Sequence, residues 1–426
     1  STAMQGGCTC ENASGLRVGT GNVEFAALFA PKPLGLTAAD DWTKEMATKG
    51  FPELKRHYAM LGAPDHVLLK AALHFGHNYN NVSRTAMYGW MNRHLNLGQH
   101  EPIVERDYTR LATAELTVWD EQHPKPDGGP EFERRLLRWL TEDTEAQLAK
   151  TTADRSEFER VQGGGVDIVI GRNLGEVGEV VWEAGAATDL AACRQIVGRL
   201  RNETYGEELP AARLHPKKTE RGTVVWVTAS GKAGLYTDAG DVRPEVLALL
   251  KGGWAVLGVD LLFQGEFLEH EKAPTRTRRV KNPREAAAYT FGYNHSLFAQ
   301  RVHDVLTAIA CLKAHADSAH RLALVGIEGG GPWVAAACAQ ACGAIDAVAL
   351  DTGGFRFGKV LDLGSVDFLP GGARFGDLPG MMALGRPPGL WLAGEGDRAP
   401  ALVEAAYAQG DARRLLTVFP GERVNV

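Results

Sequence analysis

The stretch from Leu322 to Gly331 constrains the fold of this chain more than any other. It reads Leu322-Ala323-Leu324-Val325-Gly326-Ile327-Glu328-Gly329-Gly330-Gly331, an apolar run that ends in a polar residue flanked by glycines. A helix-forming run, Pro332 to Ala341, follows it. Because glycine adopts backbone conformations that other residues avoid, the pattern predicts a strand, a sharp turn and a helix. Such a turn would hold the Glu328 side chain above the end of a sheet.

Composition narrows the class of protein. The chain has 426 residues, enough for two or three domains, and is 44% hydrophobic and 23% charged, as globular proteins are. A net charge of -6 gives no reason to expect a nucleic-acid partner, and no apolar run is long enough to predict a membrane helix. Six cysteines make no disulfide framework, and no metal or cofactor is expected.

From residue 221 onward, predicted strands and helices alternate, which favours a parallel, doubly wound sheet. Together with the turn at Glu328, this predicts an α/β fold of the α/β-hydrolase type, whose nucleophile elbow is a glycine-flanked strand–turn–helix. The segments Val166 to Ile170 and Val177 to Trp182 are expected to form an antiparallel pair at the start of this domain. The triple glycine Gly163-Gly164-Gly165 before them is expected to be a hinge.

The three positions that carry the catalytic triad in such a fold read Glu328, Asp397 and Glu422. A serine normally occupies the elbow, and a histidine the last position. We therefore expect a degenerate site kept for packing or substrate binding. A carboxylate nucleophile is an alternative, but the resulting ester would need a histidine-activated water. A cation site made of the three carboxylates is another alternative.

The amino-terminal segment carries a more conventional pair of residues. An apolar strand from Leu34 runs into Ala38-Ala39-Asp40-Asp41, and a second from Val67 leads to Gly76-His77. An aspartate that orients a histidine base is the arrangement that activates a serine. We expect Asp41 to be the acid, with Asp40 as the alternative, and His77 rather than His74 to be the base. The competing interpretation is a helix cap and a surface histidine.

Residues 1 to 98 resemble the carboxyl-terminal half of bacterial α/β-hydrolases of the acetyl xylan esterase type. The resemblance implies ester hydrolysis of an acetylated glycan by serine acyl transfer, with His77 as base, Asp41 as orienting acid and no cofactor. It also implies export to the periplasm or outside the cell. The family's serine elbow lies before this segment, so the serine-bearing half is expected to be missing. The residues that carry the resemblance are Gln5 to Asn12, Ala30 to Leu34, Thr37 to Thr43, His74 to Arg84 and Trp90 to Asn92, with a second match at Phe291 to Asn294.

Three parts are expected: a carboxyl-terminal half-domain at 1–98, a linker with a helical segment at 99–162, and a degenerate α/β-hydrolase-like domain at 163–426. Two parallel strands cannot bury both faces of a sheet, so the half-domain must pack on a partner. One hypothesis is an esterase whose serine comes from another segment or chain. The other is a non-catalytic fragment or subunit that binds a partner chain or a glycan. A serine of this chain near His77 (Ser1, Ser14 or Ser230) would favour a complete enzyme.

Overall fold

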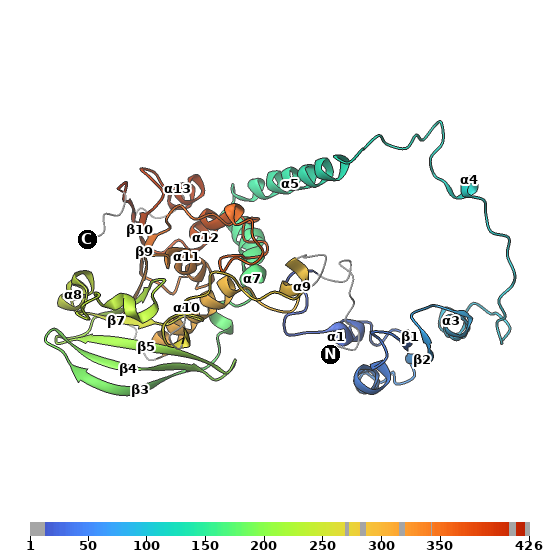
Figure 1. Ribbon diagram of the computed structural model, residues 1–426, viewed down its shortest axis with the longest axis horizontal. Coiled ribbons are helices and arrows are strands. Elements are labelled where there is room, and N and C mark those ends of the chain that lie inside the picture. Colours follow the sequence, from blue (N-terminus) through green and yellow to red (C-terminus); the bar gives the residue numbers. More distant parts are fainter. Residues whose placement is uncertain are drawn as a thin grey trace. The chain divides into compact units, whose positions relative to one another are not determined.

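The computed structural model describes residues 13–268, 272–281, 287–314, 320–341, 343–408 and 415–421. The chain divides into two compact units. The first consists of Ser1–Arg138 together with Asn282–Asn294, and the second of Trp139–Lys281 together with His295–Val426. Because each unit has its own core, each is described by itself (Figure 1).

The first unit is built around two parallel strands. Their registers match Leu34 with Val67 and Asp40 with Gly76. A small apolar core, which includes Leu54 and Tyr58, packs beside them. Asn80 caps the helix after the second strand, since its side chain accepts a hydrogen bond from the Ser83 amide at 3.3 Å. The helices and strands are α1 (Asn22–Ala27), β1 (Leu34–Asp40), α2 (Phe51–Met60), β2 (Val67–Gly76), α3 (Asn81–Leu95), α4 (Thr113–Leu116) and α9 (Ala287–Phe291).

The second unit has a nine-stranded mixed sheet in the order β11-β10-β9-β8-β6-β7-β5-β4-β3 (Figure 1). Strands β6 to β11 run parallel, while β3, β4 and β5 form an antiparallel meander that joins β7. This is an α/β-hydrolase-like fold, as the sequence predicts. The strands are β3 (Val180–Asp189), β4 (Cys193–Asn202), β5 (Glu207–Pro216), β6 (Gly222–Val227), β7 (Trp254–Val259), β8 (Arg321–Gly326), β9 (Ala347–Asp351), β10 (Gly389–Ala393) and β11 (Leu415–Val418).

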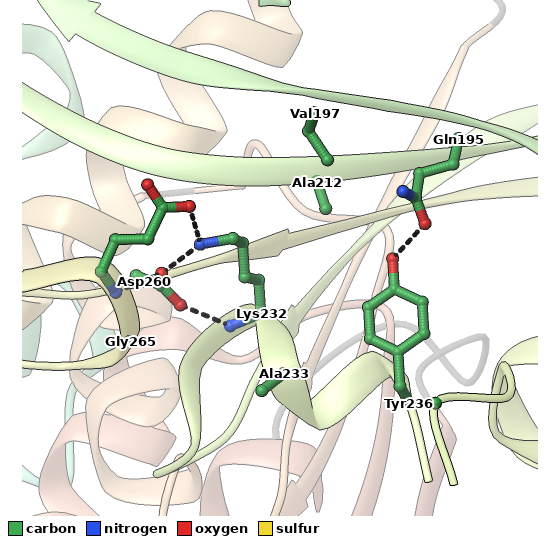
Figure 2. A pocket seen from close by; sticks show the side chains of 10 residues that line it. Gln195, Val197, Ala212, Lys232, Ala233, Tyr236, Asp260 and Gly265 are labelled. Atoms are coloured by element: carbon green, nitrogen blue, oxygen red, sulfur yellow. Dashed lines mark hydrogen bonds and ion pairs between the residues drawn. The ribbon is translucent and has the colours of Figure 1, made fainter. Parts of the chain in front are cut away.

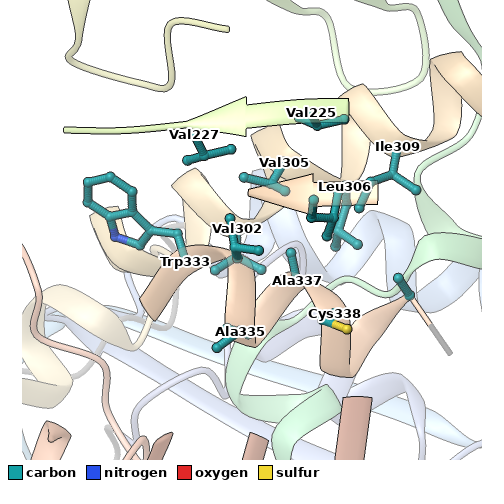
Figure 3. Packing of buried hydrophobic residues seen from close by; sticks show 14 of the residues in the cluster. Val225, Val227, Val302, Val305, Leu306, Ile309, Trp333, Ala335, Ala337 and Cys338 are labelled. Atoms are coloured by element: carbon teal, nitrogen blue, oxygen red, sulfur yellow. The ribbon is translucent and has the colours of Figure 1, made fainter. Parts of the chain in front are cut away.

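Helices cover this sheet and complete the core. All six residues of β6 are buried, and Val224 to Val227 accordingly form a continuous apolar run and not an alternating one. Figure 3 shows Val225 and Val227 of this strand close to Val302 and Leu306 of α10, with Trp333 of α11 beside them. The helices of this unit are α6 (Arg155–Phe158), α7 (Gly164–Ile170), α8 (Pro244–Lys251), α10 (Leu297–Ala314), α11 (Gly331–Gln340), α12 (Asp377–Gly385) and α13 (Ala401–Ala408). Helix α5 (Phe132–Thr151) begins in the first unit and ends in the second, and Thr151 is its only buried residue.

One sequence prediction about this unit is wrong. Val166 to Ile170 lies in α7 and not in a strand, and the antiparallel partner of β3 is β4. Val166 and Ile170 are four residues apart and both fully buried, so they share one face of a helix. The three glycines are helical and do not form a hinge. A Cβ on Gly165 would lie 2.3 Å from the Phe375 ring, so glycine permits close packing there.

Candidate active site

The two residues singled out in the first unit lie together. Strands β1 and β2 are parallel neighbours, and Asp40 pairs with Gly76 at their carboxyl ends. Asp41 directly follows β1 and His77 directly follows β2. Both residues therefore lie at the same edge of the sheet. Nδ1 of His77 is 2.9 Å from Oδ2 of Asp41. The Asp41 side chain is 10% exposed and that of His77 is 67% exposed.

The Asp41 carboxylate is held in place by its own loop. Its Oδ1 accepts hydrogen bonds from the Thr43 amide at 2.7 Å and from the Thr43 hydroxyl at 2.6 Å. Burial by itself would raise the pKa of Asp41, but the hydrogen bonds from Thr43 and His77 outweigh it and lower the pKa below the usual aspartate value. The carboxylate is therefore charged and oriented, with Oδ2 directed at the histidine.

The His77 ring is also positioned from its flank. The Trp42 ring lies 4.5 Å from the imidazole, centroid to centroid, at an interplanar angle of 37°. When Nδ1–H donates to Asp41, the lone pair of the other ring nitrogen, Nε2, can accept a proton. The contact has the geometry in which an aspartate orients a histidine base in a catalytic triad.

The alternative residues do not form such a pair. Asp40 is the last residue of β1, and His74 lies within β2, where its ring contacts Phe75 at a centroid distance of 4.1 Å. Among the described residues of the first unit, no serine is hydrogen-bonded to His77. Ser1 lies outside the described residues, and Ser230 belongs to the second unit.

The predicted elbow is present in the second unit, between β8 and α11. Glu328 has a φ of 50° and Gly329 a φ of 88°, both in the left-handed region that a nucleophile elbow requires. A Cβ on Gly330 would lie 2.2 Å from the Val227 carbonyl oxygen, and one on Gly331 would lie 2.1 Å from that of Asp351. The glycines therefore let the turn sit tightly between two neighbouring strands.

The side chain that the elbow presents is held by an arginine. Oε1 of Glu328 is 2.8 Å from Nη1 of Arg243, at the start of α8. The Glu328 carbonyl oxygen accepts a hydrogen bond from the Ala229 amide in the loop after β6 at 3.0 Å. Glu328, the residue predicted to occupy the nucleophile position, is thus one member of an ion pair.

The buried acid after β10 is not the predicted one. Asp397 is exposed, whereas Glu395 has only 5% of its side chain exposed. Glu395 accepts hydrogen bonds from Arg356 and from the Thr352 hydroxyl, both in the loop after β9. The sequence shows an acid, Glu395, two residues beyond β10. It does not show that Arg356 is the partner of this acid, because the two are brought together only by folding.

The third predicted position, Glu422, lies outside the described residues. In the part of the chain that the structure describes, no group of three histidine, cysteine or acidic side chains could hold a metal ion. No helix among those residues is long and apolar enough to span a membrane.

Comparison with known proteins gives structural neighbours only. No family model matches the chain, and no curated protein matches its sequence. Similar solved structures include a proposed acetyl xylan esterase from Bacteroides fragilis NCTC 9343 (14% identity, TM-score 0.45, covering 62% of this chain and 75% of that one). A methylesterase is 15% identical with a TM-score of 0.45, covering 66% of this chain and 64% of its own.

A promiscuous CE15 esterase from a marine bacterial metagenome is 9% identical with a TM-score of 0.41, covering 63% of this chain and 88% of its own. These three structural neighbours are a proposed acetyl xylan esterase, a methylesterase and a CE15 esterase. At these identities and TM-scores, the fold assignment rests on the strand order of the sheet and not on the likenesses.

Proposed function

We propose that this chain belongs to a carboxylic ester hydrolase in which His77 is the general base and Asp41 the acid that orients it. The observation that carries the proposal is the 2.9 Å contact between His77 Nδ1 and Asp41 Oδ2, made by loops at the ends of two parallel strands. The lowered pKa of Asp41, caused by the hydrogen bonds that outweigh its burial, keeps the carboxylate charged beside the imidazole.

The proposed reaction is serine acyl transfer. A serine hydroxyl gives its proton to Nε2 of His77 as its oxygen attacks the ester carbonyl, and Asp41 stabilises the imidazolium that forms. The imidazolium then protonates the departing alcohol. In the second half of the reaction, His77 takes a proton from water as the water oxygen attacks the acyl ester. The imidazolium then returns this proton to the departing serine oxygen, which releases the acid and regenerates the serine.

The serine in this proposal comes from a segment outside the sequence given. Two features of the first unit support this. Its sheet has only two strands among the described residues. Several large apolar side chains are also exposed there, with Leu28 at 80%, Phe29 at 57% and Leu73 at 46%. Apolar surface of this kind is typical of an interface with a further part of a protein.

The proposed substrate is a carboxylic ester, and more narrowly an acetylated glycan. The esterase class of the structural neighbours supports the first part, and the resemblance of residues 1–98 to acetyl xylan esterases supports the second. The second unit, with Glu328 and Glu395 each paired to an arginine, has no proposed catalytic part. It would be the silent member of a tandem pair.

The second candidate is a non-catalytic subunit that binds a partner chain or a glycan. The exposed apolar side chains of the first unit favour it, as does the lack of a serine bonded to His77 among the described residues there. It differs from the first candidate in requiring no turnover by this chain.

Hydrolysis of p-nitrophenyl acetate by this chain, supplied with the serine-bearing segment, separates the two candidates. His77→Ala is the test variant, and His74→Ala is the matched control on the same strand. The enzyme proposal expects turnover that His77→Ala abolishes and His74→Ala preserves. Turnover that survives His77→Ala would refute the role of His77, and no turnover by the unsubstituted chain would favour the non-catalytic subunit.

A further inference from the structure

A pocket of about 750 Å³ lies in the second unit, apart from the Asp41–His77 pair (Figure 2). This volume is within the range of about 300–1,000 Å³ that small-molecule sites occupy. One wall is the meander, where Gln195 and Val197 alternate onto one face of β4 and Ala212 pairs with Val197 from β5. The opposite wall is the loop after β6, with Lys232 and Tyr236.

The floor of the pocket is fixed by Asp260, which is fully buried at the end of β7. Its carboxylate accepts hydrogen bonds from the Lys232 amide at 2.8 Å and from the Glu266 amide at 3.0 Å, and it pairs with the Lys232 ammonium. A Cβ on Gly231 or Gly265 would lie 2.2 Å from this carboxylate, so glycine is required at both positions. Two loops are therefore tied to one buried group, and the pocket wall is preorganised.

The positive charge of Lys232 in the pocket is already paired with carboxylates. The Lys232 ammonium bonds both to Asp260 and, at 2.6 Å, to Glu266, so one cation faces two carboxylates. An anionic ligand would have to compete with two bound carboxylates and is disfavoured. The Glu266 side chain is 68% exposed and can accept further hydrogen bonds.

The second polar pair in the pocket is neutral. The Tyr236 hydroxyl donates to Oε1 of Gln195 at 2.6 Å, which leaves the tyrosine oxygen as an acceptor and the Gln195 amide group as a donor. Burial raises the pKa of Tyr236 to about 12, so the phenol stays protonated at neutral pH. The pocket thus offers alternating donors and acceptors, together with the apolar side chains of Val197 and Ala212.

We propose that this pocket binds a neutral, polyhydroxylated ligand, such as a short stretch of a carbohydrate chain. Hydroxyl groups are both donors and acceptors, so they can donate to the Glu266 carboxylate and the Tyr236 oxygen and accept from the Lys232 ammonium and the Gln195 amide group. The proposal goes beyond the ester hydrolysis assigned to His77, because it gives the second unit a binding role that needs no catalysis.

Isothermal titration calorimetry of the full chain with xylotetraose, cellotetraose and maltotetraose tests the proposal. Inorganic phosphate and spermidine serve as anionic and cationic probes. We expect at least one oligosaccharide to bind and neither charged probe to bind. Tyr236→Phe and Glu266→Gln should each weaken binding about three- to tenfold, the usual effect of losing one hydrogen bond. Glu404→Gln, an exposed change on α13, should leave it unchanged.

Circular dichroism melting identifies any variant that fails to fold, and Glu266→Gln keeps the test usable because its side chain is largely exposed. The proposal is overturned if no oligosaccharide binds, if phosphate or spermidine binds instead, or if both pocket variants bind as tightly as the parent. The same titration on His77→Ala separates this proposal from the esterase proposal, because oligosaccharide binding should be unaffected there.

Discussion

The ion pair between Glu395 and Arg356 holds the buried acid after β10, and removing one partner should show how much the pair contributes to stability. The Glu395 side chain is 5% exposed and that of Arg356 is 24% exposed. Removing one member of a fully buried pair costs about 3–5 kcal/mol, because the other charge is left unpaired. Since Arg356 is partly exposed, we expect Arg356→Ala to destabilise the second unit by about 3 kcal/mol, at the lower end of that range.

The matched variants separate charge from packing. Glu395→Gln removes the charge but can keep the hydrogen bond from Thr352, so its expected cost is about 1–2 kcal/mol. The double variant Arg356→Ala/Glu395→Gln should be no less stable than Arg356→Ala alone, because no buried charge remains unpaired. Arg374→Ala, which removes an exposed arginine from the same region, should change stability by less than about 0.5 kcal/mol.

Native-state hydrogen exchange of the amides in β10 (Gly389–Ala393) measures these differences where the pair lies. A double-mutant cycle then gives the coupling energy, which we expect to be about 2 kcal/mol. If the effects of Arg356→Ala and Glu395→Gln simply add, the two side chains are not coupled and the ion pair does not hold Glu395 in place.

Three further predictions follow from single residues. The folded-state pKa of Asp41 is lowered, because hydrogen bonds outweigh burial, so its contribution to stability is present above the unfolded aspartate value of about 3.9 and is lost as the pH falls through the folded value. Thr43→Val should weaken this acid dependence in urea unfolding curves, and unchanged curves would contradict it. Gly331→Ala should destabilise the second unit by about 2 kcal/mol or more, because its Cβ would lie 2.1 Å from the Asp351 carbonyl oxygen, whereas Gly164→Ala has open space and should be nearly neutral in thermal melts. Burial raises the pKa of the Cys311 thiol to about 11, so iodoacetamide at pH 8 should label it only after unfolding, as mass spectrometry of the digested protein would show.

The sequence predicts the elbow and the Asp41–His77 contact for the same reason: both depend on local features. The glycines around Glu328 specify the turn, and parallel strands bring the residues after Asp40 and Gly76 to one edge. Neither result requires knowledge of a distant side chain. The catalytic role of Asp41 and His77 stays a prediction.

Other features depend on contacts that the sequence does not reveal. The apolar run from Val166 to Ile170 suits either a strand or one turn of a buried helix, and packing in the core decides for the helix. The β4 strand contains Arg194, Arg199 and Arg201, and these charged residues hide the alternation of apolar and polar residues by which a strand is predicted. Glu395 can be recognised as the buried acid only in the folded structure, where it pairs with Arg356, a residue 39 positions away in the sequence.

The central claim is that Asp41 orients His77 for ester hydrolysis, and a pair of neighbouring substitutions tests it most directly. Asp41→Asn removes the charge that accepts from His77 Nδ1, while Asp40→Asn makes the same change one residue earlier. In a serine triad, the corresponding change lowers kcat by about 10⁴-fold. With the serine-bearing segment supplied, turnover of p-nitrophenyl acetate should therefore collapse in Asp41→Asn and persist in Asp40→Asn. Equal turnover in the parent and in Asp41→Asn would contradict the account.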